Sequence, residues 1–271
     1  MFMLTHTYFL QQVVETAGGK SIEPDSYVYN IAPDLLTLSP NISANRTHAI
    51  GRNITIPSVF AKAAFVFFHL FVDDLVHYGH VCDEMQEGFD ADSEGYCYLK
   101  GRRLVDAIIE LHRLLNREIS RNEAAYQSHL IIEMIYDLVI TRQIHENRTI
   151  EILVDALRYT AEKKLDEFAA VMHWMYGLEK QQIAEVLKTA SLFLTKERMA
   201  DLMTMNGRII LYQDKFGLKS DSVLFSQAVK KLFDRALNSI TDEDGLCRRA
   251  VSAMDELRRC GADLDGLLHG S

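Results

Sequence analysis

The chain contains the stretch Ala63-Ala-Phe-Val-Phe-Phe-His69-Leu-Phe-Val-Asp73-Asp74-Leu-Val-His77-Tyr-Gly-His80, in which an apolar run carries a row of imidazole and carboxylate groups. On a helix, which turns about 100° per residue, four of these groups fall within an arc of roughly 80°. They are His69, Asp73, His77 and His80. Burying so many polar groups together is costly unless something pairs them. The stretch therefore predicts a buried helix whose polar stripe faces a bound cation.

Proline is confined to the first 57 residues of the chain, at Pro24, Pro33, Pro40 and Pro57. Because proline is the strongest helix breaker, the long proline-free remainder can form one helix after another. Residues that favour helices, such as Leu, Ala, Glu and Lys, are common there, and no strand-like alternation or internal repeat is evident. The sequence therefore predicts an all-α protein.

Periodicity and end signals divide the chain into helices and two longer irregular segments, residues 17–57 and 82–101. The predicted helices cover residues 4–16, 58–81, 102–119, 120–144, 149–176, 180–193, 195–216, 222–240 and 243–259. Ser120-Arg-Asn-Glu123 fits a capping box that opens the helix at 120–144. A boundary near Asn147 would separate a metal-binding helical core at residues 1–145 from a C-terminal helical region at residues 146–271, as two domains or as parts of one.

The composition is that of an ordinary globular chain with a net charge of -9, which argues against binding a nucleic-acid backbone. An anionic substrate stays compatible, because bound divalent cations reverse the local field. The four cysteines show no CxxC spacing, so a reduced compartment is favoured. No leader peptide is recognisable, and the apolar run at residues 65–75 is too short to span a membrane. We therefore expect a cytoplasmic protein without a transmembrane segment, of open oligomeric state.

A second helical pair, His129-Leu-Ile-Ile-Glu133, places an imidazole and a carboxylate on one face through its i, i+4 spacing. Together with the first stripe and with polar groups nearer the N-terminus, it makes up the set of candidate metal ligands. They are His6, Asp34, His48, His69, Asp73, His77, His80, His129 and Glu133. Imidazole and carboxylate ligands without thiolates suit catalytic zinc, and so many ligands would serve more than one ion.

Other polar residues carry weaker signals. The remaining histidines are predicted to be hydrogen-bonding residues rather than ligands; they are His112, His145, His173 and His269. Asp74 points about 100° away from Asp73 on a helix. It could therefore serve as a cap, as a partner of a metal ligand or as a solvated charge.

The order His6, Pro33-Asp34, His48, His69-x3-Asp73, His77 or His80, and His129-x3-Glu133 resembles the zinc-dependent phospholipase C family, which is related to the P1-type nucleases. The resemblance covers about residues 1–140 and implies an all-helical core with zinc ions in a cleft, here followed by additional C-terminal helices. It implies that one zinc is held by Asp34, His48, His69 and Asp73. A second would be held by His129, Glu133 and either His77 or His80, with Gly79 slightly favouring His80. His6 and Asp73 would contribute to a third.

The resemblance also implies a function, the hydrolysis of a phosphoester substrate such as one with a lipid headgroup, by attack of a metal-bound hydroxide on phosphorus. Asp34 is the candidate general base as well as a ligand. In that family a processed N-terminal Trp completes the third site, whereas this chain begins Met-Phe-Met. Either two or three zinc ions are therefore expected.

Two alternatives remain open. One is a metal-stabilised helical binding or scaffold protein without catalysis, which the large unassigned C-terminal region suits. The other is a different helical metal-dependent phosphohydrolase, although the His-Asp dipeptide of one such class is absent here. The Glu-x-x-His pairs of carboxylate-bridged di-iron bundles also differ from the four-residue spacing and opposite order found in this chain.

Overall fold

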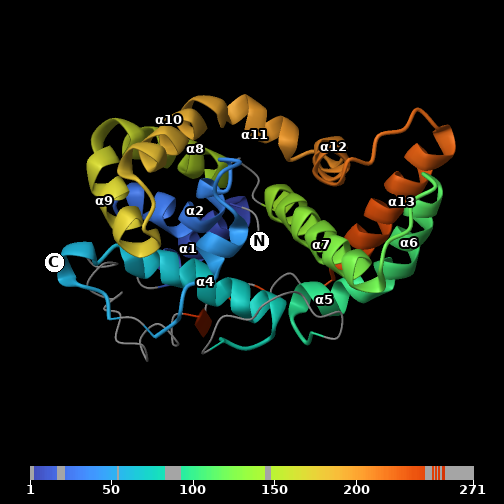
Figure 1. Cartoon of the computed structure of the whole chain (residues 1–271), viewed down its shortest axis with the longest axis horizontal. Helices are drawn as coiled ribbons and strands as arrows, with labels where there is room; N and C mark the ends of the chain where they lie inside the picture. Colours follow the sequence, from blue (N-terminus) through green and yellow to red (C-terminus); the bar gives the residue numbers. More distant parts are fainter. Residues whose placement is uncertain are drawn as a thin grey trace.

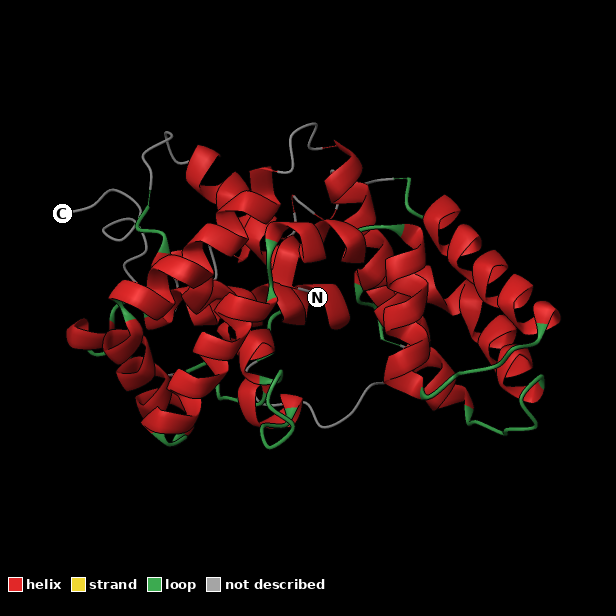
Figure 2. Ribbon diagram, turned by 90° about the horizontal axis from the view of Figure 1, so that it is seen from above, coloured by secondary structure: helices red, strands yellow, loops and turns green. Residues whose placement is uncertain are grey.

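The computed structural model of the chain describes residues 3–16, 22–53, 55–82, 93–143 and 148–241, together with residues 246, 248, 250, 252 and 253. Within this part the protein is helical without strands, which confirms the all-α prediction (Figure 1, Figure 2). The α-helices are α1 (Met3–Thr16), α2 (Asp25–Leu36), α3 (Ala44–His48), α4 (Ala63–His77), α5 (Tyr96–Gly101), α6 (Val105–Arg113), α7 (Arg121–Gln143), α8 (Arg148–Lys163), α9 (Leu165–Tyr176), α10 (Lys180–Phe193), α11 (Lys196–Leu202), α12 (Met205–Phe216) and α13 (Val223–Ser239). Two short 3-10 helices are η1 (Ser58–Phe60) and η2 (Arg102–Leu104).

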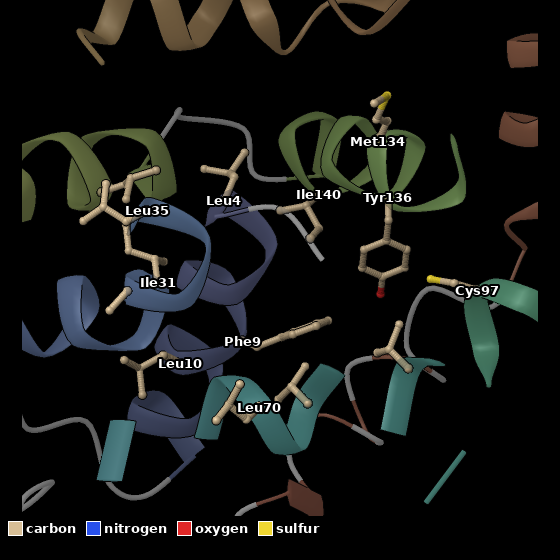
Figure 3. Close-up of a cluster of buried hydrophobic side chains, with 14 of the residues drawn as sticks. Leu4, Phe9, Leu10, Ile31, Leu35, Leu70, Cys97, Met134, Tyr136 and Ile140 are labelled. Carbon is tan, nitrogen blue, oxygen red and sulfur yellow. The ribbon is translucent and has the colours of Figure 1, made fainter. Parts of the chain in front are cut away.

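Helix α4 packs against α2 and α5, and all of its side chains except Leu75 and His77 are buried. A helix that is apolar on every side belongs in such a position, because each of its faces must be covered. Figure 3 shows a cluster of buried side chains in which Leu70 of α4 lies near Phe9 of α1, Ile31 of α2 and Tyr136 of α7. The polar stripe of α4 is therefore inside the protein.

The prediction that residues 17–57 are irregular is wrong, because two helices form there. α2 carries Pro33 in its interior, where a proline lacks the N–H that a helix normally uses. Ten of the twelve α2 residues are buried, including Val28 and Leu35, and this packing outweighs the local cost of the proline. α3 begins after Ser43, whose side chain accepts a hydrogen bond from the backbone N–H of Arg46 at 3.3 Å.

Several predicted boundaries also shift. The helix predicted at 149–176 divides at Lys164 into α8 and α9, and the one at 195–216 divides before Met205, where Thr204 caps α12. Residues 96–101, expected to be irregular, form α5, and the helix expected at 102–119 shortens to η2 and α6. Residues 83–92 of the acidic segment lie outside the described residues, as does most of the predicted helix 243–259.

The capping box at the start of α7 is confirmed by reciprocal hydrogen bonds. The Ser120 N–H donates to Glu123 Oε2 at 2.8 Å, and the Glu123 N–H donates to Ser120 Oγ at 3.1 Å. The pair satisfies two of the backbone donors that a helix start leaves unpaired. It fixes the start of the helix that carries His129 and Glu133.

Helices from both halves of the chain contribute to one cluster of buried hydrophobic side chains. α8 packs against α1 and α2, while α12 and α13 pack against α7. In Figure 1, α8 to α11 arch over the N-terminal helices and α13 lies beside α6 at the other end. Among the described helices, none combines the length and apolar character needed to cross a membrane.

Candidate metal centre

Asp73 stands at the middle of a group of imidazoles and directs its two oxygens to different neighbours. Its Oδ1 lies 3.2 Å from His6 Nε2 of α1, and its Oδ2 lies 3.3 Å from His69 Nε2 one turn earlier on α4. The rings of His6 and His69 stack with their centroids 3.6 Å apart. All three side chains are buried, so these atoms could hold a cation out of contact with bulk water.

Asp34 and His48 extend this group toward the surface. His48 Nε2 lies 3.4 Å from His69 Nε2, 3.5 Å from Asp73 Oδ2 and 3.5 Å from Asp34 Oδ1. Four ligand atoms at zinc's usual bond length of about 2.0–2.1 Å, arranged as a tetrahedron, would be about 3.3–3.4 Å apart. The triangle of His48 Nε2, His69 Nε2 and Asp73 Oδ2, with sides of 3.3–3.5 Å, matches one face of such a tetrahedron, and Asp34 Oδ1 lies 3.5 Å from one of its corners, His48 Nε2. The side chains of Asp34 and His48 are 22% and 27% exposed, so this is the side open to solvent.

A further group joins the end of α4 to α7. His77 Nε2 lies 2.7 Å from Glu133 Oε1, and His129 Nε2 lies 4.0 Å from the same oxygen. Tyr98 stacks on the His129 ring at 5.0 Å, and Tyr126 contacts that ring from another direction at the same centroid distance. The group therefore has residues that could bind a metal ion, and two tyrosine rings pack against its His129. It also contains a direct contact between His77 and Glu133.

His80, the slightly favoured alternative to His77, lies elsewhere. α4 ends at His77, and Gly79 adopts a left-handed conformation with φ of 83° that turns the chain away. His80 is exposed and belongs to none of the three groups, whereas His77 faces Glu133. The structure thus gathers eight of the nine candidate ligands and leaves His80 outside.

Burial sets the protonation of the imidazoles inside the groups. It lowers the pKa of His6 to about 3, with His69 adding to the effect, and it lowers the pKa of His129 to about 3 as well. Both rings are therefore neutral at pH 7 and keep a nitrogen lone pair. Burial by itself would raise the pKa values of Asp73 and Glu133, but electrostatic attraction, to which the neighbouring imidazoles contribute, holds both below their usual range. Neutral imidazoles beside ionised carboxylates are the forms that bind metal ions.

Four buried atoms of His6, Asp34 and His69 lack a hydrogen-bond partner among the described residues: both ring nitrogens of His6, Nδ1 of His69 and Oδ2 of Asp34. His6 Nε2 lies 3.2 Å from Asp73 Oδ1 without forming a hydrogen bond to it. Buried polar atoms are almost always paired, and each exception calls for a reason. A cation between the imidazoles and carboxylates would satisfy His6 Nε2 and Asp34 Oδ2, so the residues fit zinc.

Arg52 holds the loop after α3 against α4, a role that the sequence did not indicate. Its Nε and Nη2 donate to the two carboxylate oxygens of Asp74 at 2.9 and 2.7 Å, and its Nη1 donates to the His48 carbonyl at 2.9 Å. The Cys82 N–H adds a bond to Asp74 at 3.2 Å. Of the roles left open for Asp74, its burial rules out a solvated charge; its carboxylate is held by Arg52, which also bonds the backbone of His48.

The other described histidines make hydrogen bonds outside the metal groups. His112 Nε2 lies 3.0 Å from Gln127 Oε1, an oxygen that also accepts from the Tyr212 hydroxyl at 2.7 Å. His173 Nδ1 donates to the Leu178 carbonyl at 2.7 Å. His145 and His269 lie outside the described residues.

Comparisons of this chain with protein-family models, with curated proteins and with solved structures found no match.

Proposed function

We propose that this protein is a zinc-dependent phosphoester hydrolase that resembles phospholipase C. The observation that carries the proposal is the triangle of His48 Nε2, His69 Nε2 and Asp73 Oδ2, whose sides of 3.3–3.5 Å match the spacing of zinc ligands, with Asp34 Oδ1 a further 3.5 Å from His48 Nε2. The partial exposure of Asp34 and His48 supports a catalytic rather than a sealed structural site, because a catalytic zinc keeps one position open.

Zinc ions bound in these groups would lower the pKa of a water molecule and neutralise phosphate oxygens. Residues of the chain would hold the ions and accept the proton of the water molecule. Asp73 can serve two ions because its oxygens face different imidazoles. Asp34 is the candidate base that accepts a proton from water, since its Oδ2 has no hydrogen-bond partner in the described part of the chain. The hydrogen bond from His48 holds the pKa of Asp34 below its usual range despite burial, so this carboxylate is ionised at pH 7.

The third group supports a second zinc ion less directly. Its His77–Glu133 contact of 2.7 Å is a hydrogen bond, shorter than the spacing of two zinc ligands. Zinc would have to replace the shared proton and part the two side chains by about 0.6 Å. We propose two or three zinc ions, with the group around Asp34, His48, His69 and Asp73 as the first to fill.

The test is elemental analysis of protein purified without chelators, together with turnover of bis(4-nitrophenyl) phosphate. We expect at least two zinc ions per chain and measurable hydrolysis. Asp73→Asn should lower the zinc content by at least one ion and reduce turnover by at least 100-fold, because it removes a charge shared by two groups. His173→Gln, a change at an exposed histidine outside the groups, should leave both quantities unchanged.

Two results would decide against the proposal. Protein that holds zinc firmly but hydrolyses neither phosphodiesters nor phosphomonoesters would favour the non-catalytic scaffold. Protein that binds no zinc, or an Asp73→Asn variant with the zinc content of the wild type, would remove the basis for the site.

A further inference from the structure

The carboxylate of Asp137 joins three helices just beyond the metal groups. Asp137 lies on α7 one turn after Glu133 and is completely buried. Its Oδ1 accepts hydrogen bonds from the backbone N–H of Thr5 at 3.1 Å and from the Thr5 hydroxyl. Its Oδ2 accepts from Arg208 Nη2 of α12 at 2.7 Å. Arg208 is only 2% exposed, so both charges are removed from water.

The bonds from Thr5 make Asp137 a cap for α1 that is supplied by another helix. α1 begins at Met3, so the Thr5 N–H is one of the first-turn donors that the helix itself cannot satisfy. A carboxylate at a helix N-terminus is also favoured by the helix dipole. This contact fixes the start of α1 on α7 at the residue that precedes His6.

The backbone of His6 is held from the other side as well. Its carbonyl accepts a hydrogen bond from Asn30 Nδ2 of α2 at 2.8 Å. With Thr5 tied to α7 and the His6 carbonyl tied to α2, the His6 ring is directed onto His69, with its Nε2 3.2 Å from Asp73. The position of this candidate ligand therefore depends on Asp137.

Arg208 is the cationic partner of Asp137 in this place, with its Nη2 2.7 Å from Asp137 Oδ2. A buried carboxylate without a cationic partner is strongly disfavoured, and Glu133 on the same helix adds a second negative charge nearby. We infer that Arg208, which lies in the C-terminal half of the chain, is a positioning residue that aligns His6 for metal binding through Asp137 and Thr5. The inference rests on the proposed function, since it concerns a ligand of that site. It gives α12 a part in a site whose candidate ligands all lie before residue 134.

Zinc alone is the probe, titrated into the metal-free full-length protein in competition with a chromophoric chelator. Wild-type protein should bind at least two ions. Arg208→Met, which keeps the length but removes the charge, should weaken the zinc site that includes His6 by at least tenfold. Arg208→Lys should recover part of this loss because it restores the charge. In a His6→Ala background, Arg208→Met should have no further effect, since two changes that act through one group are not additive.

A matched control is Lys62→Met. Lys62, the residue that precedes α4, bonds the buried Asp25 carboxylate through its Nζ at 2.6 Å, so its loss also breaks a buried ion pair, but one that contains no candidate ligand. It should lower the melting temperature without changing zinc affinity. If Arg208→Met does not fold, Thr5→Val removes only the hydroxyl donor and should weaken the same zinc site about threefold to tenfold.

The inference is overturned if the folded variants at Arg208 and Thr5 bind zinc as the wild type does. It is also overturned if Arg208→Met lowers zinc affinity equally in the wild-type and His6→Ala backgrounds. The effect of Arg208 would then not act through His6. Wild-type protein that binds no zinc overturns the proposed function and this inference together. The wild-type titration, done first, tells these failures apart.

Discussion

Asp73 occupies the only position on α4 that lies one turn from both His69 and His77, the first and last imidazoles of that helix. The i, i+4 geometry of a helix therefore places this carboxylate on the same face of α4 as both imidazoles. Its two oxygens face His6 on one side and His48 with His69 on the other. A single side chain could thus contribute one oxygen to each of two neighbouring ions.

The choice between His77 and His80 gives a prediction at the same scale. His77→Ala removes a partner of Glu133 and should lower zinc content by up to one ion and turnover by at least tenfold. His80→Ala changes an exposed ring outside the groups and should leave both within twofold of the wild type. Zinc analysis and turnover of the two variants, prepared in parallel, would make the comparison. The reverse pattern would show that the chain beyond Gly79 folds back in the metal-bound protein.

At the scale of elements, the position of His77 depends on how α5 meets the end of α4. Gly95 lies directly against the His77 carbonyl, and the Ser93 hydroxyl donates a hydrogen bond to that same oxygen. A Cβ on Gly95 would overlap the backbone of His77, so only glycine permits this approach.

Gly95→Ala should therefore push α5 away from α4 and cost about 1–3 kcal/mol of stability, as overpacking commonly does. Zinc affinity of the group around His77 should fall, while the group around His48 keeps its affinity. Gly51→Ala is the control, because a Cβ there meets nothing within 4 Å. Urea unfolding and zinc titration of both variants provide the measurement. Equal stability and equal zinc affinity of the two variants would show that the close approach of Gly95 to His77 does not matter for the site.

Much of the site could be predicted at this scale because helix geometry fixes it. The pairs His69–Asp73 and His129–Glu133 follow from four-residue spacing, and the burial of α4 follows from its apolar composition. The parts that the sequence could not give depend on tertiary contacts. α2 forms in spite of Pro33, and Arg52 reaches Asp74 across 22 residues. The backbone of Gly79, rather than residue spacing, excludes His80.

At the scale of the whole molecule, the metal-free protein should lose stability as the pH falls from 7 toward 5. The folded chain holds the pKa values of His6 and His129 near 3, whereas an unfolded chain would bind protons at about pH 6.5. Between these values the unfolded state takes up more protons, so stability decreases as pH falls. The two rings together should account for on the order of 3 kcal/mol between pH 6.5 and pH 5.

Urea unfolding in the presence of a chelator would measure this pH dependence. Asp34 and Asp73 raise the pKa of His48 in spite of its burial. The contribution of His48 to stability therefore changes only above pH 6.5, outside the range considered for His6 and His129. The lowered pKa of Glu133 affects stability mainly below about pH 4.5, the range in which an unfolded glutamate titrates. His129→Gln should remove about half of the slope between pH 6.5 and pH 5, and an unchanged slope would show that other groups cause it.

Removal of zinc should destabilise the entire described fold, because the candidate ligands come from α1, α2, α3, α4 and α7. A cation that binds only the folded state adds about 2.7 kcal/mol at one hundred times its dissociation constant. For a chain of this size that corresponds to a fall in melting temperature of about 5–10 °C when a chelator is added. Zinc should reverse the fall and magnesium should not, since imidazole-rich sites suit zinc and magnesium requires oxygen ligands. The melting temperature of Asp73→Asn should fall much less when the chelator is added. If the melting temperature of the wild type does not depend on zinc, these imidazoles and carboxylates stabilise the fold through hydrogen bonds alone.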